Sequence, residues 1–258
     1  MIPGSVALTA PLEPGSLATV TEVIDGDTVR LDDGRQVRLT GIQAPKLPLG
    51  RPGFRAWPLA EPAKAGMAAL SLNRSVSLGY GGRRSDRHGR ILAHLFSDDG
   101  AWLQGEMLRL GLARVYSFAD NTACVDAMLD LERDARAAGR GIWGLDWYAI
   151  KPAAPEVGPF GTFQLVEGIV RRADVVRGRL YLNFGDDWRT DFTVSASPKV
   201  RAALDRQRFD YKSLENRPVR VRGWIDERNG PMLELSHKEQ IEQLDAPPRK
   251  AEPCVIGP

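Results

Sequence analysis

The sequence predicts an α+β, mainly β protein with two domains, each built around a small β-barrel. In the first half, segments that alternate between apolar and polar residues precede segments with helical spacing, as in a domain whose helices pack on a sheet. In the second half, five short strands with a helix between the third and the fourth have the order of an OB-fold. The 258 residues are enough for two domains of ordinary size.

The first domain is organised around residues 23–46, which read V-I-D-G-D-T-V-R-L-D-D-G-R-Q-V-R-L-T-G-I-Q-A-P-K. The alternation of apolar residues predicts three short strands, joined by an acidic turn and by a second turn at Asp33 and Gly34. A period of two places Asp25 and Asp27 on the same side of their strand and turns Arg38 away from its apolar neighbours. Carboxylates and a guanidinium on one sheet form a candidate site for a phosphate and for a metal ion.

The rest of the first domain follows from composition and spacing. Residues 46–62 are rich in proline and glycine and predict a long loop with apolar anchors. Helices are predicted at 63–72, 101–110 and 121–138, and further strands at 74–80 and 91–96, with a basic turn over 81–90 between these two strands.

A proline-rich stretch at 151–161 marks the boundary between the two domains. We therefore expect an irregular segment over 1–17, the first domain over 18–150, a linker over 151–161, an OB-like domain over 162–245 and a disordered tail over 246–258. In the second domain the predicted strands are 163–171, 179–184, 191–195, 218–225 and 232–235, and the predicted helix is 199–208.

Composition indicates a soluble globular protein, because 43% of the residues are hydrophobic and 26% are charged. The net charge of +2 is too small to select a partner by itself. No segment approaches the length of a membrane span, so we expect no membrane partner. The N-terminus lacks a basic start and is interrupted by Pro3 and Gly4, so it is not an intact signal peptide, and the chain is either cytoplasmic or exported after processing. Composition gives no oligomeric state.

The two cysteines and the two central histidines do not form a metal-binding pattern. Cys124 lies in a predicted helix and Cys254 in the proline-rich tail, so we expect a buried small residue and an exposed thiol rather than a disulfide. His88 and His94 stand six residues apart without a cysteine or carboxylate partner, which argues against metal ligation by them.

Four segments of the first domain together resemble the staphylococcal nuclease (thermonuclease) family. They are I-D-G-D-T at 24–28, R-L-x-G-I-x-A-P at 38–45, D-R-H-G-R at 86–90 and G-I-W at 141–143, within a similar stretch of about residues 18–147. The resemblance implies an OB-type five-stranded barrel with packed helices and a phosphodiester hydrolase that acts on nucleic acid. In that family two aspartates and a backbone carbonyl bind calcium, a glutamate activates water, and two arginines stabilise the pentavalent phosphate.

The resemblance assigns roles by position. Asp27 matches the first calcium-binding aspartate, with Asp25 beside it, and Arg38 and Arg90 match the two arginines. Arg87 falls where the family has a lysine near the nucleotide, and Tyr116 and Phe118 fall near aromatic residues that contact it.

Two side chains depart from the family pattern. Gln43 replaces the second aspartate and Lys46 replaces the catalytic glutamate, whereas Ala44 still offers a backbone carbonyl. These changes make the site more positive by three charges. Because calcium takes six to eight oxygen ligands and depends on carboxylate charge, we expect no cofactor, or at most weak calcium binding at Asp27 and Asp25.

Three interpretations of this site remain. In the first, the domain binds nucleic acid, DNA or RNA and preferably single-stranded, through Arg38, Arg87, Arg90, Lys46, Tyr116 and Phe118, and has lost calcium-dependent hydrolysis. In the second, it is an active nuclease with a modified and calcium-independent site, in which Arg38, Arg90, Lys46 and Gln43 are catalytic. In the third, the arginines are buried ion-pair partners of Asp25 and Asp27.

The second domain combines cations with aromatic residues, which is how OB-folds hold single strands. The arginines are Arg171, Arg172, Arg177, Arg179, Arg217, Arg220 and Arg222, and the aromatic residues are Tyr181, Phe184, Trp188 and Trp224. The pattern is equally that of aromatic side chains filling the barrel and of solvated arginines, and the sequence leaves both interpretations open.

Overall fold

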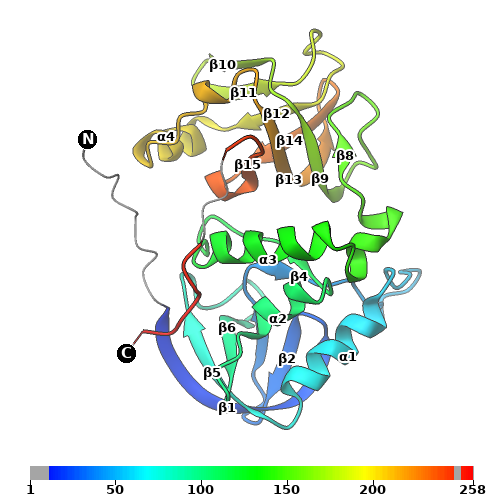
Figure 1. The fold of residues 1–258 in the computed structure, drawn as a ribbon, viewed down its shortest axis with the longest axis vertical. Helices are drawn as coiled ribbons and strands as arrows, with labels where there is room; N and C mark the ends of the chain where they lie inside the picture. Colours follow the sequence, from blue (N-terminus) through cyan, green and yellow to red (C-terminus); the bar gives the residue numbers. More distant parts are fainter. Residues whose placement is uncertain (1–11, 247–250, 258) are drawn as a thin grey trace. The chain divides into compact units, whose positions relative to one another are not determined.

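The computed structural model describes residues 12–246 and 251–257 (Figure 1). It divides into two compact units. The first contains the described residues up to Trp147 together with 251–257, and the second begins at Tyr148. The expected irregular segment over 1–11 and the part of the expected tail at 247–250 lie outside the described residues.

The first unit is built on a closed barrel of five strands (Figure 1). Two antiparallel hairpins link the first three strands, a parallel pairing joins the third to β6, and β5 closes the ring against β1. In barrel order the strands are β1 (Glu13–Asp25), β2 (Thr28–Leu31), β3 (Gln36–Leu39), β6 (Ile91–Ser97) and β5 (Ser75–Tyr80). The predicted α+β barrel is therefore confirmed.

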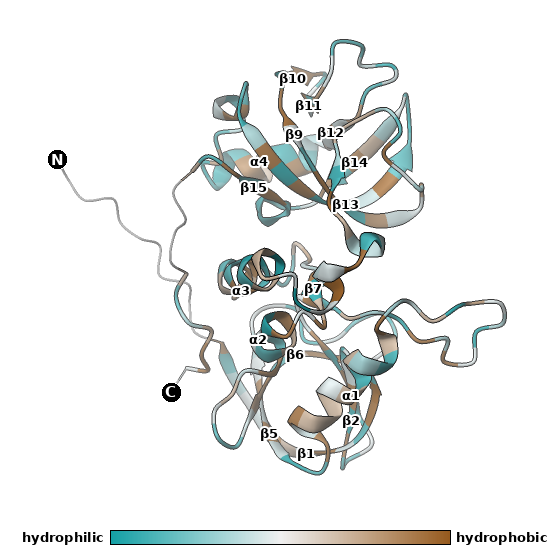
Figure 2. Cartoon of the chain, turned by 45° about the vertical axis from the view of Figure 1, so that its right-hand side comes forward, coloured by the Kyte–Doolittle hydropathy of each residue, from teal (hydrophilic) through white to brown (hydrophobic). Residues whose placement is uncertain are grey.

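Helices pack on this barrel and fill it with apolar side chains. They are α1 (Ala60–Ser71), α2 (Leu103–Arg109) and α3 (Val125–Ala137), followed by 3-10 turns at Gly141–Gly144 and Asp146–Tyr148. Met67 of α1 and Met107 of α2 are fully buried among strand residues such as Val29 and Leu95. The hydropathy colouring shows apolar residues along these strands and helices (Figure 2). A separate two-stranded sheet, β4 (Ile42–Gln43) with β7 (Arg114–Val115), ties the loop after β3 to the segment after α2.

Two expectations for the ends of the first unit are wrong. Residues 13–17 are not irregular, because β1 starts at Glu13 and pairs with β5 through Glu13 with Tyr80 and Leu17 with Ser77. Leu17 is 73% exposed, so the pairing rests on backbone hydrogen bonds and leaves no buried alternation in the sequence to reveal it.

Residues 251–257 do not form a disordered tail, and the expectation of a buried Cys124 and an exposed Cys254 thiol rather than a disulfide is wrong. Cys254 forms a disulfide with Cys124, immediately before α3. The segment also pairs with Leu12, whose N–H donates to the Val255 carbonyl at 2.9 Å and whose carbonyl accepts from Gly257 at 2.8 Å. Leu12 is buried against this segment, so a covalent bond and a small apolar cluster hold the end of the chain on the first unit.

The second unit is a curled half-barrel sheet of the OB-like kind, with one helix (Figure 1). Its hydrogen-bonded order is β10 (Arg172–Val176), β11 (Arg179–Asn183), β12 (Thr193–Ala196), β14 (Pro231–Leu235), β13 (Pro218–Glu227), β9 (Thr162–Ile169) and β8 (Lys151–Pro152), and β15 (Ile241–Gln243) also pairs with β13. Helix α4 (Pro198–Arg206) follows β12, as expected, and further 3-10 turns lie at Lys212–Leu214 and Lys238–Gln240. The sequence did not predict β10, β8 or β15.

None of the helices that the structure describes is long and apolar enough to cross a membrane.

Candidate functional site

Asp25 and Asp27 lie together where β1 ends and turns into β2. The Asp27 N–H donates to Oδ1 of Asp25 at 3.1 Å, and the Thr28 hydroxyl donates to Oδ1 of Asp27 at 3.1 Å. The Asp27 side chain is fully buried and Asp25 is nearly so. Two carboxylates this close in the interior require cationic partners, because burial and mutual repulsion both disfavour the charged forms.

Lys46 supplies the first of these cations. Its Nζ lies 2.7 and 2.6 Å from the two carboxylate oxygens of Asp27 and 3.2 Å from Oδ2 of Asp25. An ammonium group has three N–H donors, and these contacts match that number. The backbone N–H of Ala44 also donates to the cluster, at 2.7 Å from Oδ2 of Asp27.

Arg38 is the second cation, and most of its donors serve the fold. Nη1 donates to the carbonyls of Asp27 and Leu39 at 3.2 and 2.8 Å, and Nη2 donates to the Ile42 carbonyl at 2.7 Å. Nη2 also lies 3.3 Å from Oδ2 of Asp27. These bonds fix the chain between β3 and β4, which leads to Ala44 and Lys46. Among the described residues the Nε–H of Arg38 has no hydrogen-bond acceptor.

The pKa values of the two aspartates shift in opposite directions. Burial acts to raise the pKa of Asp27, but the Arg38 guanidinium and the Lys46 ammonium outweigh burial and hold that pKa below its ordinary value. Burial and the neighbouring Asp27 carboxylate raise the pKa of Asp25. Asp27 is therefore the charged centre of the cluster, and Asp25 is the carboxyl that takes up a proton first.

The Gln43 side chain pairs with Arg114. Its Oε1 accepts from Nε and Nη2 of Arg114 at 3.0 and 2.7 Å. The two residues are also backbone partners in the short sheet of β4 and β7, and the Arg114 guanidinium lies 5.8 Å from the ring centroid of Trp57. Gln43 thus belongs to a buried Gln–Arg pair and not to the Asp25–Asp27 cluster.

The residues present do not fit the calcium ion that the family resemblance implies. The position between the two carboxylates, where a divalent cation would bind, is taken by the Lys46 ammonium. At the position of the second family aspartate stands an amide whose oxygen already accepts two hydrogen bonds. A site that binds calcium needs several unengaged oxygens with negative charge, and this cluster lacks them.

The remaining predicted site residues lie on the surface loops of the first unit. Arg90 directly precedes β6, and Leu92 of β6 pairs with Arg38 of β3. The Nε of Arg90 donates to Oδ2 of Asp86 at 2.7 Å. Arg87 is exposed in the same turn. Tyr116 and Phe118 follow β7 and meet edge to face with ring centroids 5.0 Å apart. The structure thus joins Asp25, Asp27, Arg38 and Lys46 directly, whereas the Arg90 side chain pairs with Asp86 and the Tyr116 ring packs against Phe118.

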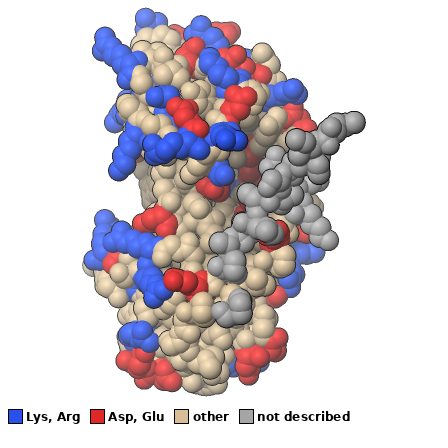
Figure 3. Space-filling view, turned by 90° about the vertical axis from the view of Figure 1, so that its left-hand side faces the viewer, with Lys and Arg blue, Asp and Glu red and all other residues tan. Residues whose placement is uncertain are grey.

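In the second unit, two of the seven predicted arginines, Arg220 and Arg222, are largely buried in ion pairs, and a third, Arg217, forms an ion pair at the surface. Arg222 is 1% exposed and forms an ion pair with Glu242, and Arg220 pairs with Glu167 at 2.5 Å. Arg217 pairs with Asp245 at 2.9 Å. The side of the molecule in Figure 3 shows the same tendency, with carboxylates interspersed among the cations. Phe184 is likewise a core residue.

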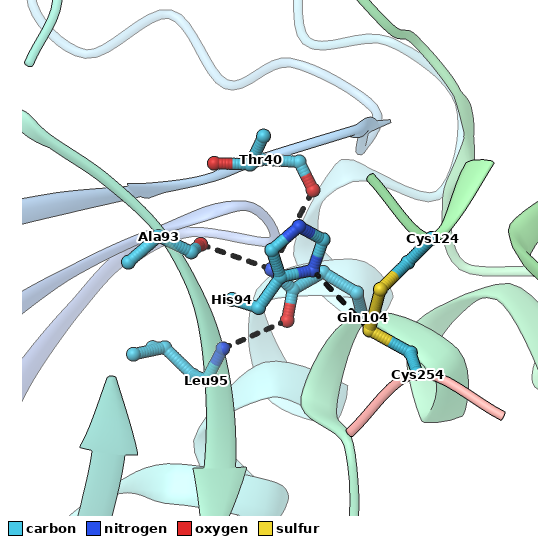
Figure 4. Close-up of a disulfide and its surroundings, with 7 residues drawn as sticks. All are labelled: Thr40, Ala93, His94, Leu95, Gln104, Cys124 and Cys254. Atoms are coloured by element: carbon cyan, nitrogen blue, oxygen red, sulfur yellow. Dashed lines mark hydrogen bonds between the residues drawn. A yellow bond between two sulfur atoms is a disulfide. The ribbon is translucent and has the colours of Figure 1, made fainter. Parts of the chain in front are cut away.

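Sequence reasoning missed two buried features of the first unit. The first is Arg114, whose role depends on pairing with a residue 71 positions away. The second is the disulfide, whose Cys254 Sγ lies 4.0 Å from Nδ1 of the buried His94 (Figure 4). Burial lowers the pKa of His94 to about 3, so its ring is neutral at ordinary pH. The even number of cysteines was the one sequence signal for this pair.

Comparison with known proteins places these features in a family. The model of the staphylococcal nuclease homologue family matches residues 36–144. An uncharacterized endonuclease of Escherichia coli is 31% identical over 127 residues, which are 48% of this chain and 74% of that protein. Endonuclease YncB of Bacillus subtilis (strain 168) is 30% identical over 135 residues, which are 50% of this chain and 63% of that protein. With its closed barrel and these relatives, the chain belongs to the staphylococcal nuclease homologue family.

Proposed function

We propose that the first unit binds the phosphodiester backbone of nucleic acid and does not hydrolyse it with calcium. The observation that carries this proposal is the position of Lys46, whose ammonium donates to both Asp25 and Asp27. The protein's own side chain thereby neutralises the carboxylates that would otherwise attract a divalent ion. Membership of a nuclease family supports nucleic acid as the ligand.

The same contacts argue against general-base catalysis in this cluster. A lysine acts as a base only when Nζ has a free lone pair, and here Nζ is engaged as a donor with both carboxylates. Asp27 is fully buried and Asp25 is 4% exposed, so both carboxylates are shielded from the solvent that would supply an attacking water. Activation of the attacking water therefore has no group in this cluster to perform it.

Phosphate binding has better support. Arg90 is held by one carboxylate and its side chain is 32% exposed, so part of its planar fork is open to an external anion. Arg87 adds a second, exposed cation in the same turn. Phe118 is 51% exposed and rests against Tyr116, which offers an aromatic surface to a base. The Nε–H of Arg38 is a further donor beside the cluster.

A binding and cleavage assay on the full chain tests this proposal. A fluorescently labelled single-stranded DNA oligonucleotide is titrated in EDTA and again in calcium, and its integrity is followed on a gel. We expect salt-sensitive binding of equal strength in both buffers with the oligonucleotide intact. Arg90→Ala should weaken binding, whereas Arg74→Ala, which removes an exposed arginine elsewhere in the same unit, should not. Calcium-stimulated cleavage by the unmodified protein would overturn the proposal.

An active, calcium-independent nuclease is the second candidate. The observation in its favour is that relatives at 30 and 31% identity carry the name endonuclease. In this candidate mechanism the Lys46 ammonium stabilises the charge on the phosphate in the transition state. To do so, Lys46 must break its contact with Asp25 or Asp27. Cleavage in EDTA that survives Arg74→Ala and is abolished by Lys46→Arg, which keeps the charge but changes its geometry, would favour this candidate over binding alone.

A further inference from the structure

The second unit has a cavity of about 450 Å³ on the face of its sheet that points away from the core. The strand register places lining residues side by side, since Asp174 of β10 pairs with Tyr181 of β11, and Asn183 of β11 pairs with Thr193 of β12. The residues on either side of Tyr181, Leu180 and Leu182, are fully buried in the core. The period of two therefore separates an apolar inner face from an outer face that carries charged and aromatic groups.

Two connecting segments form the rim of this cavity. The segment between β11 and β12 contributes Trp188, which is 48% exposed, and the turn between β13 and β14 contributes Arg228 and Asn229. The guanidinium of Arg189 lies 4.7 Å from the centre of the Trp188 ring, so the ring already lies beside a cation. The rim thus supplies a second aromatic surface and further positive charge next to Tyr181.

The charge of the lining favours an anion. Three arginines line the cavity, Arg172, Arg179 and Arg228, against one carboxylate, Asp174. Arg179 is held by Glu234 at 2.9 Å, and Arg172 lies 3.7 Å from Asp174 in an exposed pair, which is a weak interaction. Within the described part of the chain the Arg228 guanidinium has neither an ion pair nor a hydrogen bond, and it can therefore bind an external phosphate.

We propose that this cavity is a second nucleic-acid site, specific for unpaired nucleotides. A base would stack between or against Tyr181 and Trp188, and the adjoining phosphates would contact Arg228 and Arg172. Bases in a duplex are stacked on one another, so only a single strand can present a base to these rings. The volume is that of a pocket for one small ligand unit, which suits a nucleotide or two rather than a duplex. The proposal rests on nucleic acid being the ligand of this protein, but it concerns a surface separate from the Asp25–Asp27 cluster.

Binding of a labelled single-stranded DNA oligonucleotide by the full chain in EDTA tests this site. Loss of a stacked base is worth about 1–3 kcal/mol, so Trp188→Ala should weaken binding about tenfold and Trp188→Phe should restore most of it. Trp224→Ala is the matched control, because Trp224 is also 48% exposed and does not line the cavity. Arg228→Ala should weaken binding and lower its salt dependence, with Arg206→Ala, an exposed arginine of α4, as its control.

The outcomes separate this site from the function proposed for the first unit. If Arg90→Ala weakens binding while Trp188→Ala and Arg228→Ala leave it within twofold of wild type, the second site is rejected and the first stands. The second site is supported if Arg90→Ala, Trp188→Ala and Arg228→Ala all weaken binding of the single strand. In that case only Arg90→Ala should also weaken binding of a duplex. Equal losses with Trp188→Ala and Trp224→Ala would indicate a general effect on the unit and reject the site. If an acidic peptide binds at Trp188 and the oligonucleotide does not, the proposed ligand is wrong.

Discussion

In the first unit the Lys46 ammonium donates to both Asp25 and Asp27, whereas in the second unit the Arg228 guanidinium meets no acceptor in the described residues. Both residues are cations beside a β-sheet, but the sequence pattern singles out Lys46 by its motif position and does not single out Arg228. The first is enclosed and balanced by carboxylates, and the second lies on the rim of a cavity with exposed aromatic rings. Whether a cation is available to a ligand therefore depends on how far the fold buries it and satisfies its donors with internal partners. The first unit should accordingly lose stability when its internal charges or covalent link change, and the second should lose mainly affinity.

The largest expected effect concerns the link between Cys124 and Cys254. Cys254→Ser, or reduction of the wild type, should lower the free energy of unfolding of the first unit by about 4 kcal/mol, because the bond closes a very long loop and anchors residues 251–257. Chemical denaturation with and without a reducing agent measures this effect. The reducing agent should have no further effect on Cys254→Ser, and equal stability of oxidised and reduced wild type would contradict the role of the bond.

A somewhat smaller loss is expected from removal of the Lys46 charge. Lys46→Met should destabilise the first unit by about 3 kcal/mol, since it leaves the buried Asp25 and Asp27 carboxylates with Arg38 as their remaining cation. Urea denaturation, with Lys64→Met on α1 as a control for loss of a lysine, provides the comparison. A Lys46→Met protein as stable as wild type would mean that the ammonium is not an integral part of the cluster.

The pH dependence of the first unit gives a third effect. Because burial lowers the pKa of His94 to about 3, the unfolded chain binds a proton here below about pH 6.5 that the folded chain does not bind until about pH 3. Stability should therefore fall as the pH is lowered into this window, by about 1.4 kcal/mol from this residue when the pH reaches about 5.5. His94→Leu should show a flatter profile in denaturation at several pH values. If the two profiles are parallel, His94 does not stay neutral in the folded state.

The part of the site that could be read from sequence is the part set by local pattern. The alternation over residues 23–46 predicts the β1–β2–β3 meander and brings Asp25, Asp27 and Arg38 to one place, as found. Lys46, at the position of the family's catalytic glutamate, indicates that the site carries more positive charge than in the family. The sequence does not indicate that Nζ reaches both carboxylates, because this depends on the path of the loop that Arg38 fixes through its backbone hydrogen bonds.

The features that escaped prediction are long-range. Gln43 and Arg114 are 71 residues apart and the two cysteines are separated by 130, so no periodicity connects either pair. The first part of β1 has exposed side chains and leaves no hydrophobic alternation to detect. In the second unit, Arg172, Arg179 and Arg222 look alike in the sequence, and only the fold shows that Arg222 is buried with Glu242 while the other two line a cavity.

The most direct test of the central claim is the thermal stability of the wild-type protein in calcium compared with EDTA. An ion that binds only the folded state raises the melting temperature, and the rise grows with the logarithm of the ion concentration divided by its Kd. Because the Lys46 ammonium already lies between Asp25 and Asp27, we expect millimolar calcium to leave the melting temperature of the wild type unchanged. Lys46→Glu, which replaces the ammonium with a third carboxylate, should be destabilised in EDTA and should gain stability when calcium is added. A calcium-dependent rise in the melting temperature of the wild type itself, lost in Asp27→Asn, would contradict the claim.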